Sequence, residues 1–172
     1  MTDYFIDKHC DWSTRAIDSK CSDFMAIGVQ YLLSIRGLEL LYIPQILIVE
    51  DEPAVRDFLD CVLADDGYSI TALGTAREAL RAIQDVDFEA IIVDMSLPDA
   101  DGIDLVRQIH SDVPYVPVLA ISGMMVADLP RAVRSAGAAA TLMKPTTSRK
   151  VRQAIHQLLA ARRKSGAITA AA

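Results

Sequence analysis

Four short hydrophobic runs, each ending in polar residues, constrain the fold of this chain more than any other feature. The runs and their ends are Ile46–Val49 before Glu50 and Asp51, Ala90–Val93 before Asp94, Val118–Ile121 before Ser122, and Thr141–Met143 before Lys144. Short continuous apolar runs are typical of parallel strands that are buried on both faces. If each run is such a strand, the polar ends meet at one edge of one sheet, and three carboxylates, a hydroxyl and an ammonium group converge there.

From Gln45 onward, strand patterns alternate regularly with helix patterns. The expected strands are 45–50, 69–73, 90–94, one that Pro117 opens and that runs into Ser122, and 141–143. The expected helices are 53–64, one after Thr75, one over 103–109, one between 126 and 135, and about 148–163. The alternation predicts an α/β sandwich. Right-handed crossovers then predict a doubly wound, flavodoxin-like parallel sheet of five strands in the order 2-1-3-4-5.

The chain divides into an N-terminal extension at 1–44, a domain at 45–164 and a tail at 165–172. We expect the extension to be partly helical or disordered. Its apolar stripe consists of Ile27, Tyr31, Ile35, Leu38 and Tyr42. Such a helix could pack on the domain or pair with a second copy. Alternatively, it could be an artefact of an upstream start codon, with Met25 as the true start of the protein. We expect the tail to be disordered and too short for an effector domain.

The composition favours a cytoplasmic protein without a membrane span. Arg36 and Glu39 interrupt the apolar part of the extension, and each charge costs about 3 kcal/mol at a bilayer centre. Three cysteines, an odd number without metal-ligand spacing, suit a reducing compartment. Cys61 lies in an amphipathic helical pattern and is expected to be a small buried residue.

Charge is distributed unevenly along the chain. Residues 1–124 carry a formal charge of −14, whereas residues 125–172 carry +8. Nucleic-acid binding is one interpretation of the basic part, but no recognition motif accompanies it, so we favour a solvated helix face and expect no direct DNA binding. The basic residues of the last helix could dock an acidic partner or a second copy.

Three carboxylates in contact cannot all remain ionised unless positive charge compensates them. Lys144 supplies one positive charge, and a divalent cation would supply two. Ligands that are all oxygen favour Mg²⁺. A carboxylate held in this way can attack phosphorus in line, and Ser122 can donate a hydrogen bond to the acyl phosphate that forms.

The motifs together resemble the receiver domain of two-component response regulators, over about 45–164. They are Ile46 to Pro53, Val93 to Pro98 with Asp101-Gly102, Ser122-Gly123 and Lys144-Pro145. The resemblance implies that Asp94 accepts a phosphoryl group from a histidine kinase or histidine phosphotransfer protein. It implies a Mg²⁺ site made of Glu50, Asp51, Asp94 and the backbone carbonyl of Ser96, a Lys144 that pairs with the phosphoryl group, and a cis peptide before Pro145.

The sequence departs from the family at the switch that follows phosphorylation. Thr141 stands three positions before Lys144, where the family usually has an aromatic residue, and Thr146 replaces a second aromatic. In the family, a hydroxyl residue such as Ser122 couples to that aromatic and changes the face of the fourth helix, fifth strand and fifth helix. We expect Asp94 to be phosphorylated but the response of this face, a possible homodimer or target surface, to be muted.

Each of these residues, taken alone, also has a purely structural interpretation. Asp94 could cap a turn, Glu50 and Asp51 could begin a solvated helix, and Ser122 and Lys144 could be structural or surface residues. Two other functions also remain: a degenerate receiver that binds partners without chemistry, and a haloacid-dehalogenase-like phosphohydrolase. The second would need an acid two residues after Asp94, where this chain has Ser96.

Overall fold

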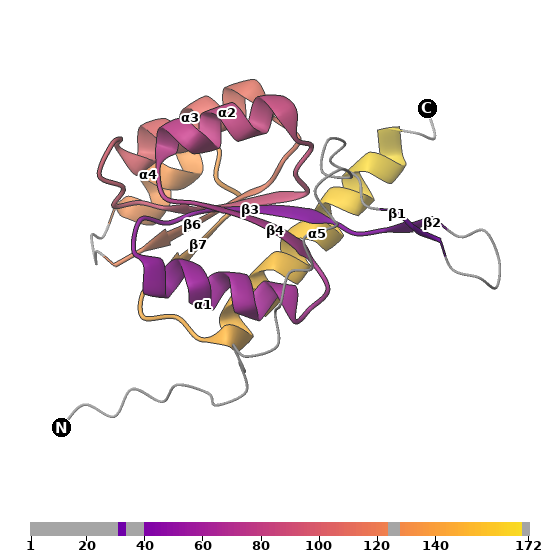
Figure 1. Ribbon diagram of the computed structural model, residues 1–172. Coiled ribbons are helices and arrows are strands. Elements are labelled where there is room, and N and C mark those ends of the chain that lie inside the picture. Colours follow the sequence, from indigo (N-terminus) through magenta and orange to yellow (C-terminus); the bar gives the residue numbers. More distant parts are fainter. Residues whose placement is uncertain (1–30, 34–39, 124–127, 170–172) are drawn as a thin grey trace.

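The computed structural model describes residues 31–33, 40–123 and 128–169, and five parallel strands form its main sheet between two helical layers (Figure 1). The strands are β3 (Gln45–Val49), β4 (Ser69–Leu73), β5 (Ala90–Asp94), β6 (Val118–Ser122) and β7 (Ala140–Met143). The helices are α1 (Pro53–Ala64), α2 (Ala76–Asp85), α3 (Gly102–Asp112), α4 (Leu129–Ser135) and α5 (Ser148–Thr169). Their spatial order, β4-β3-β5-β6-β7, confirms the predicted 2-1-3-4-5 arrangement and the flavodoxin-like α/β class.

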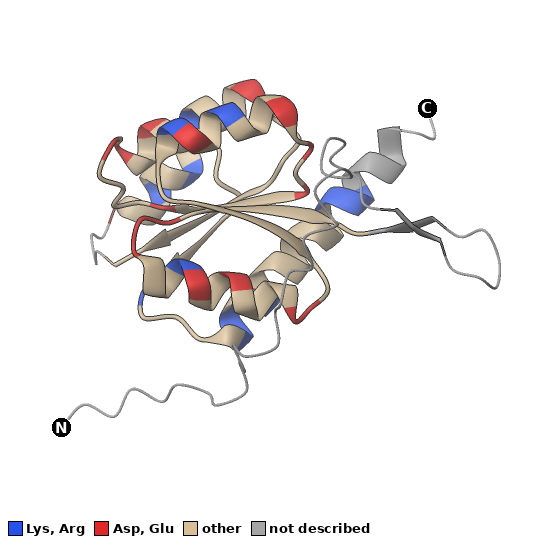
Figure 2. Cartoon of the chain, viewed as in Figure 1, with Lys and Arg blue, Asp and Glu red and all other residues tan. Residues whose placement is uncertain are grey.

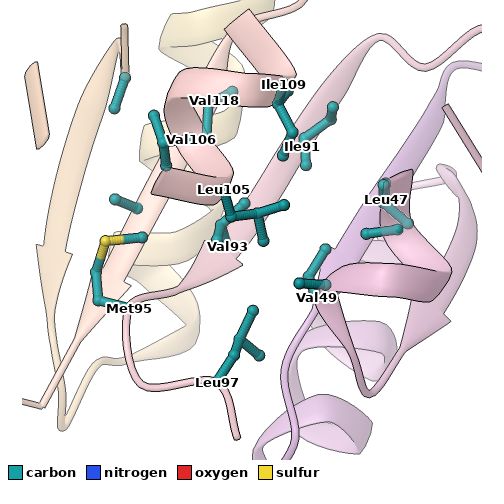
Figure 3. Packing of buried hydrophobic residues seen from close by; sticks show 14 of the residues in the cluster. Leu47, Val49, Ile91, Val93, Met95, Leu97, Leu105, Val106, Ile109 and Val118 are labelled. Carbon is teal, nitrogen blue, oxygen red and sulfur yellow. The ribbon is translucent and has the colours of Figure 1, made fainter. Parts of the chain in front are cut away.

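Alternate residues of the central strands pack into two separate cores. Leu47 and Val49 of β3, with Ile91 and Val93 of β5, face the layer of α2, α3 and α4 (Figure 3). The intervening residues of the same strands face α1 and α5. Because both faces are covered, every residue of β5 and β6 is buried. Burying each large apolar side chain contributes about 1.5–3 kcal/mol, so this double burial fixes the strands and the positions of their ends.

Local signals mark the start of α2 and the turn after α1, as the sequence predicts. Thr75 caps α2 by accepting a hydrogen bond from the amide of Glu78 at 3.2 Å, and its hydroxyl donates to the Glu78 carboxylate at 2.7 Å. The first bond is the N-cap half of the predicted capping box, whereas the second joins the two side chains and does not reach the Thr75 amide. After α1, Gly67 has a φ of +86°, a conformation that residues with a Cβ rarely adopt. Thr75 thus begins α2 just after β4, and Gly67 allows the turn between α1 and β4.

The structure differs from the sequence prediction in the extension. Tyr31 and Tyr42, which were both assigned to one helical stripe, lie opposite each other in two antiparallel strands, β1 (Tyr31–Leu33) and β2 (Leu40–Tyr42). The described positions are therefore extended rather than helical, since short apolar runs fit either period, and the expectation for the rest of the extension stays a prediction. The remaining stripe positions, Ile27, Ile35 and Leu38, lie outside the described residues.

Two further predictions need correction. Helix α5 continues to Thr169, so residues 165–169 are helical where a disordered tail was expected, which is consistent with the high helix propensity of alanine and lysine around them. Cys61 is half-buried rather than buried, and its sulfur is disulfide-bonded. Within the described part of the chain, no helix is both long and apolar enough to cross a bilayer.

Candidate functional site

The polar strand ends meet at the carboxyl edge of the sheet, as the sequence predicts. Glu50 and Asp51 follow β3, Asp94 ends the adjacent strand β5, and Ser122 ends β6. Lys144 directly follows β7, and its amide donates to the carbonyl oxygen of Ser122 at 2.7 Å. In Figure 2, acidic residues occupy the loop after β3, whereas α5 has basic residues.

Three carboxylates form a compact cluster at this edge. Oxygens of Glu50, Asp51 and Asp94 all lie within 4.8 Å of one another. The side chains of Glu50 and Asp94 are only 1% and 3% exposed, whereas Asp51 is exposed. The strands place them because β3 and β5 are neighbours in register, with Val49 opposite Val93. Buried acids in contact repel one another, so the cluster needs positive charge nearby.

Lys144 supplies that positive charge from the end of β7, at the same edge of the sheet. Its Nζ lies 2.9 Å from Oε1 and 2.7 Å from Oε2 of Glu50, and it donates to Oδ2 of Asp94 at 2.9 Å. The peptide between Lys144 and Pro145 is cis, as the resemblance implied. One ammonium group therefore bridges two buried carboxylates, and the four side chains retain a formal charge of −2.

The pKa values reflect this crowding. Burial, together with repulsion from Asp94, raises the pKa of Glu50 despite its hydrogen bond to Lys144. Burial alone would lower the pKa of Lys144, but its hydrogen bonds to Glu50 and Asp94 outweigh that effect and raise it. The ammonium form of Lys144 is thus favoured, whereas ionisation of Glu50 is less favourable in the folded protein than in water.

A hollow of about 480 Å³ opens over the cluster. Its walls are formed by Glu50, Asp51, Glu52, Pro53, Asp94, Ser96, Gly123 and Lys144. Oδ1 of Asp94 accepts a hydrogen bond from the amide of Ser96 at 3.2 Å, which ties the loop after β5 to the cluster. Small polar molecules can thus approach the carboxylates from solvent.

Two of the predicted residues do not line this hollow. Ser122 is fully buried at the end of β6, and Thr141 lies half-buried within β7, opposite Ala120. Both are close in sequence to wall residues, Gly123 and Lys144 respectively. The structure therefore separates the residues that contact the hollow from the two that were predicted to act as a switch.

The structure adds two residues that the sequence analysis did not single out. Arg56 donates from Nη1 to the carbonyl oxygens of Glu50 and Asp51. Asp99, in the loop after β5, accepts hydrogen bonds from the amides of Ala76 and Arg77 at 3.0 and 3.2 Å. These bonds lower the pKa of Asp99. Neither residue belongs to a periodic pattern, so no sequence signal indicated its partner.

The cluster also fits a hard divalent cation. All of its donor atoms are carboxylate oxygens, the type that Mg²⁺ and Ca²⁺ prefer. Both oxygens of Glu50 already lie within 2.9 Å of the Lys144 ammonium, yet the three carboxylates outnumber the one positive charge beside them. A divalent cation would balance the remaining negative charge.

These features define a doubly wound α/β protein with an acidic site at the carboxyl edge of its sheet. Residues 46–156 match the model of the response regulator receiver domain. A receiver domain protein described as CheY-like, from Methanospirillum hungatei, is 29% identical and superposes with a TM-score of 0.69, covering 72% of this chain and 98% of that one. The chain belongs to the family of response regulator receiver domains of two-component systems.

The relatives that match by sequence are longer proteins, of which this chain spans only part. The sensory/regulatory protein RpfC of Xanthomonas campestris is 31% identical over 111 residues, which are 62% of this chain and 15% of that protein. The probable transcriptional regulatory protein TcrX of Mycobacterium tuberculosis is 27% identical over 124 residues, which are 72% of this chain and 52% of that protein. The similarity thus supports the receiver domain and does not extend to the rest of these relatives.

Proposed function

We propose that the chain accepts a phosphoryl group on Asp94 from a histidine kinase or a histidine phosphotransfer protein. The observation that carries this proposal is the ammonium group of Lys144, within 2.9 Å of both Glu50 and Asp94 in a cluster of three carboxylates. A purely structural ion pair would need one carboxylate. The surplus acids are explained if the site must also hold a cation and a phosphoryl group.

The three clustered acids, Ser96 and Lys144 each have a role in this proposal. Glu50, Asp51, Asp94 and the backbone carbonyl of Ser96 would hold Mg²⁺, which when bound neutralises charge on the acids and on phosphoryl oxygens. Asp94 is the acceptor because it is buried, ends the central strand β5 and faces Lys144. Lys144 can exchange its bond to Asp94 for one to the incoming phosphoryl oxygens.

The transfer balances as a simple displacement. An oxygen of Asp94 forms the bond to phosphorus, the phosphorus–nitrogen bond of a phosphohistidine breaks, and the imidazole leaves with its electron pair. Lys144 remains protonated throughout, consistent with its raised pKa. The acyl phosphate is labile, and water later releases phosphate, so the chain both takes up and loses the group without turning over a separate substrate.

The output of this event belongs to the proposal as well. Ser122 would rotate to donate a hydrogen bond to the phosphoryl group. Thr141 occupies the position through which the family transmits this rotation to the face of the fourth helix, fifth strand and fifth helix. The face of α4, β7 and α5 would contact a downstream protein or a second copy. We place this exchange in the cytoplasm and expect protein contacts rather than DNA contacts.

Incubation with acetyl phosphate and Mg²⁺, followed by intact mass measurement, tests the proposal. We expect one phosphoryl group per chain, lost at alkaline pH, and no adduct on Asp94→Asn, which preserves the shape of the side chain. Beryllofluoride then tests the switch by NMR, where we expect small shifts over 131–152. Large shifts there would contradict the muted response.

The same measurement separates the alternatives. The chain would be a degenerate receiver, which binds partners without chemistry, if neither acetyl phosphate nor a phosphorylated phosphotransfer protein ever gave the adduct. Continuous release of phosphate without accumulation of a stoichiometric adduct would indicate a phosphohydrolase. Either result would refute the proposal that the chain is a phosphoryl-accepting receiver.

A further inference from the structure

Arg56 lies in the first turns of α1 and reaches back to the loop that carries two of the acids. Its Nη1 donates to the carbonyl oxygen of Glu50 at 2.7 Å and to that of Asp51 at 3.2 Å. The side chain is half-buried, and a Cβ built on Gly74 would lie 3.5 Å from Nη1. The guanidinium group thus fits between the turn after β3 and the residue that follows β4.

The turn after β3 has few other side-chain supports. Glu52 is the N-cap of α1, yet its side chain makes no capping hydrogen bond. Its carbonyl oxygen accepts from the amides of Val55 and Arg56, and the amide of Glu50 donates to the carbonyl of Leu73 at 3.0 Å. These backbone bonds hold the two ends of the turn. The Arg56 side chain holds the carbonyls between those ends.

We propose that Arg56 is a positioning residue for the acidic cluster. By bonding two consecutive carbonyl oxygens, it fixes the peptide planes from which the carboxylates of Glu50 and Asp51 extend toward Asp94. Arg56 thereby sets the affinity of the cluster for a divalent cation. The inference rests on the proposed function and adds a residue that contacts neither the cation nor the phosphoryl group.

Geometry and electrostatics predict opposite consequences of removing this side chain. A cation close to the cluster repels a second cation, so loss of the guanidinium charge alone would tighten Mg²⁺ binding. Loss of a group that orients metal ligands typically weakens metal binding by about 10–100-fold. The direction of the change therefore distinguishes a positioning residue from a neighbouring charge.

Calorimetric titration of the full chain with Mg²⁺ provides the measurement. We expect Arg56→Met to bind Mg²⁺ at least about ten-fold more weakly than the wild type. Arg56→Lys keeps the charge but shortens the reach, so its affinity should be intermediate. Arg81→Met is the matched control, because Arg81 is exposed on α2 and the same charge is removed. Its affinity should equal that of the wild type.

Hydrogen exchange of the metal-free proteins gives a second measurement that needs no Mg²⁺. Amides of the segment 50–56 should exchange faster in Arg56→Met, and partly so in Arg56→Lys, while those of β5 remain unchanged. Should Arg56→Met fail to fold, Arg56→Lys carries the test in both measurements. Unchanged or tighter Mg²⁺ binding by the folded variants would overturn the inference.

The two proposals fail in distinguishable ways. If the wild type binds Mg²⁺ and takes up phosphoryl groups but the Arg56 variants do so equally well, the role of Arg56 is refuted and the function stands. If the wild type gives neither a Mg²⁺ response nor an adduct, both proposals are refuted together. If Mg²⁺ binds in the predicted rank order without any adduct, the function is refuted and Arg56 still positions a cation site.

Discussion

At the amino edge of the sheet, Arg162 faces one acidic side chain, whereas at the carboxyl edge Lys144 faces a cluster of three. Arg162 Nη1 donates to the carbonyl oxygens of Phe88 and Glu89 at 2.9 and 2.8 Å and lies 3.3 Å from Oε2 of Glu89. The side chains of this pair are 30% and 22% exposed. Charge is balanced there, and solvent reaches both partners.

The carboxyl edge has the opposite properties. Glu50 and Asp94 are almost fully buried, and with Asp51 they leave a surplus of negative charge beside Lys144. Burying an uncompensated charge costs several kcal/mol, so folding alone gives no reason to retain it. The comparison teaches that a cation and acid in contact need not mark function. An excess of buried acid over base is the more informative feature.

The largest expected effect comes from removing the cation of the crowded edge. Lys144→Met leaves Glu50 and Asp94 buried without a counter-charge, and we expect the metal-free unfolding free energy to fall by about 3 kcal/mol. Chemical denaturation at neutral pH measures it. Arg162→Met should cost less, because Glu89 is more exposed.

Lys150→Met controls for loss of a lysine, since Lys150 is exposed at the start of α5. Added Mg²⁺ should restore part of the stability of Lys144→Met by replacing the lost charge. Equal losses for the Lys144 and Lys150 variants would mean that the cluster carries less negative charge than the geometry indicates.

Neutralising an acid should have opposite signs at the two edges. Asp94→Asn removes repulsion within the cluster and keeps an acceptor for Lys144, so the metal-free protein should gain about 1 kcal/mol. Glu89→Gln removes the only carboxylate that pairs with Arg162 among the described residues and should lose a few tenths. Paired denaturation curves without metal test this. A loss of stability in both variants would contradict the inference that Asp94 is held in an excess of negative charge and Glu89 in a balanced pair.

The fold and the convergence of the acids were both accessible from the sequence. Buried parallel strands give continuous apolar runs, so the bounds of β5 were predicted to the residue. The bounds of α1 followed from its apolar stripe. Convergence followed because parallel strands end at one edge. Asp94 was therefore expected beside Glu50, although 44 positions separate them in the chain. The family resemblance added the cis peptide before Pro145, which no periodicity indicates.

What the sequence did not reveal depends on side chains that reach across loops. Arg56 and Asp99 bond to backbone groups of neighbouring turns, and such bonds depend on side-chain reach and loop direction rather than on a repeat. The strands around Tyr31 and Tyr42 were missed for another reason, because a short apolar run satisfies both helical and extended periods. Helix α5 exceeded its predicted end because that end was placed from the apolar stripe, whose last buried residue is Leu159.

The smallest expected effect concerns two acids of the carboxyl edge whose pKa values move in opposite directions. Backbone hydrogen bonds lower the pKa of Asp99, so its contribution is present above the ordinary value of 3.8 and is lost as pH falls through the lower folded value. Burial raises the pKa of Glu50, so its ionisation destabilises the folded protein as pH rises above the ordinary value of 4.5. Asp99→Asn should thus be less stable than the wild type near pH 7 and approach it near about pH 3.

Glu50→Gln should show the reverse dependence, with its advantage over the metal-free wild type appearing as pH rises. Thermal unfolding of the three proteins across this pH range, with a chelator present, measures both differences. The location of an acid at the functional edge does not by itself determine the sign, since Asp99 and Glu50 both lie there. The sign depends on whether amide donors stabilise the carboxylate, as in Asp99, or burial destabilises it, as in Glu50. Parallel pH profiles for the two variants would show that neither the amide donors of Asp99 nor the burial of Glu50 determines the energetics of this edge.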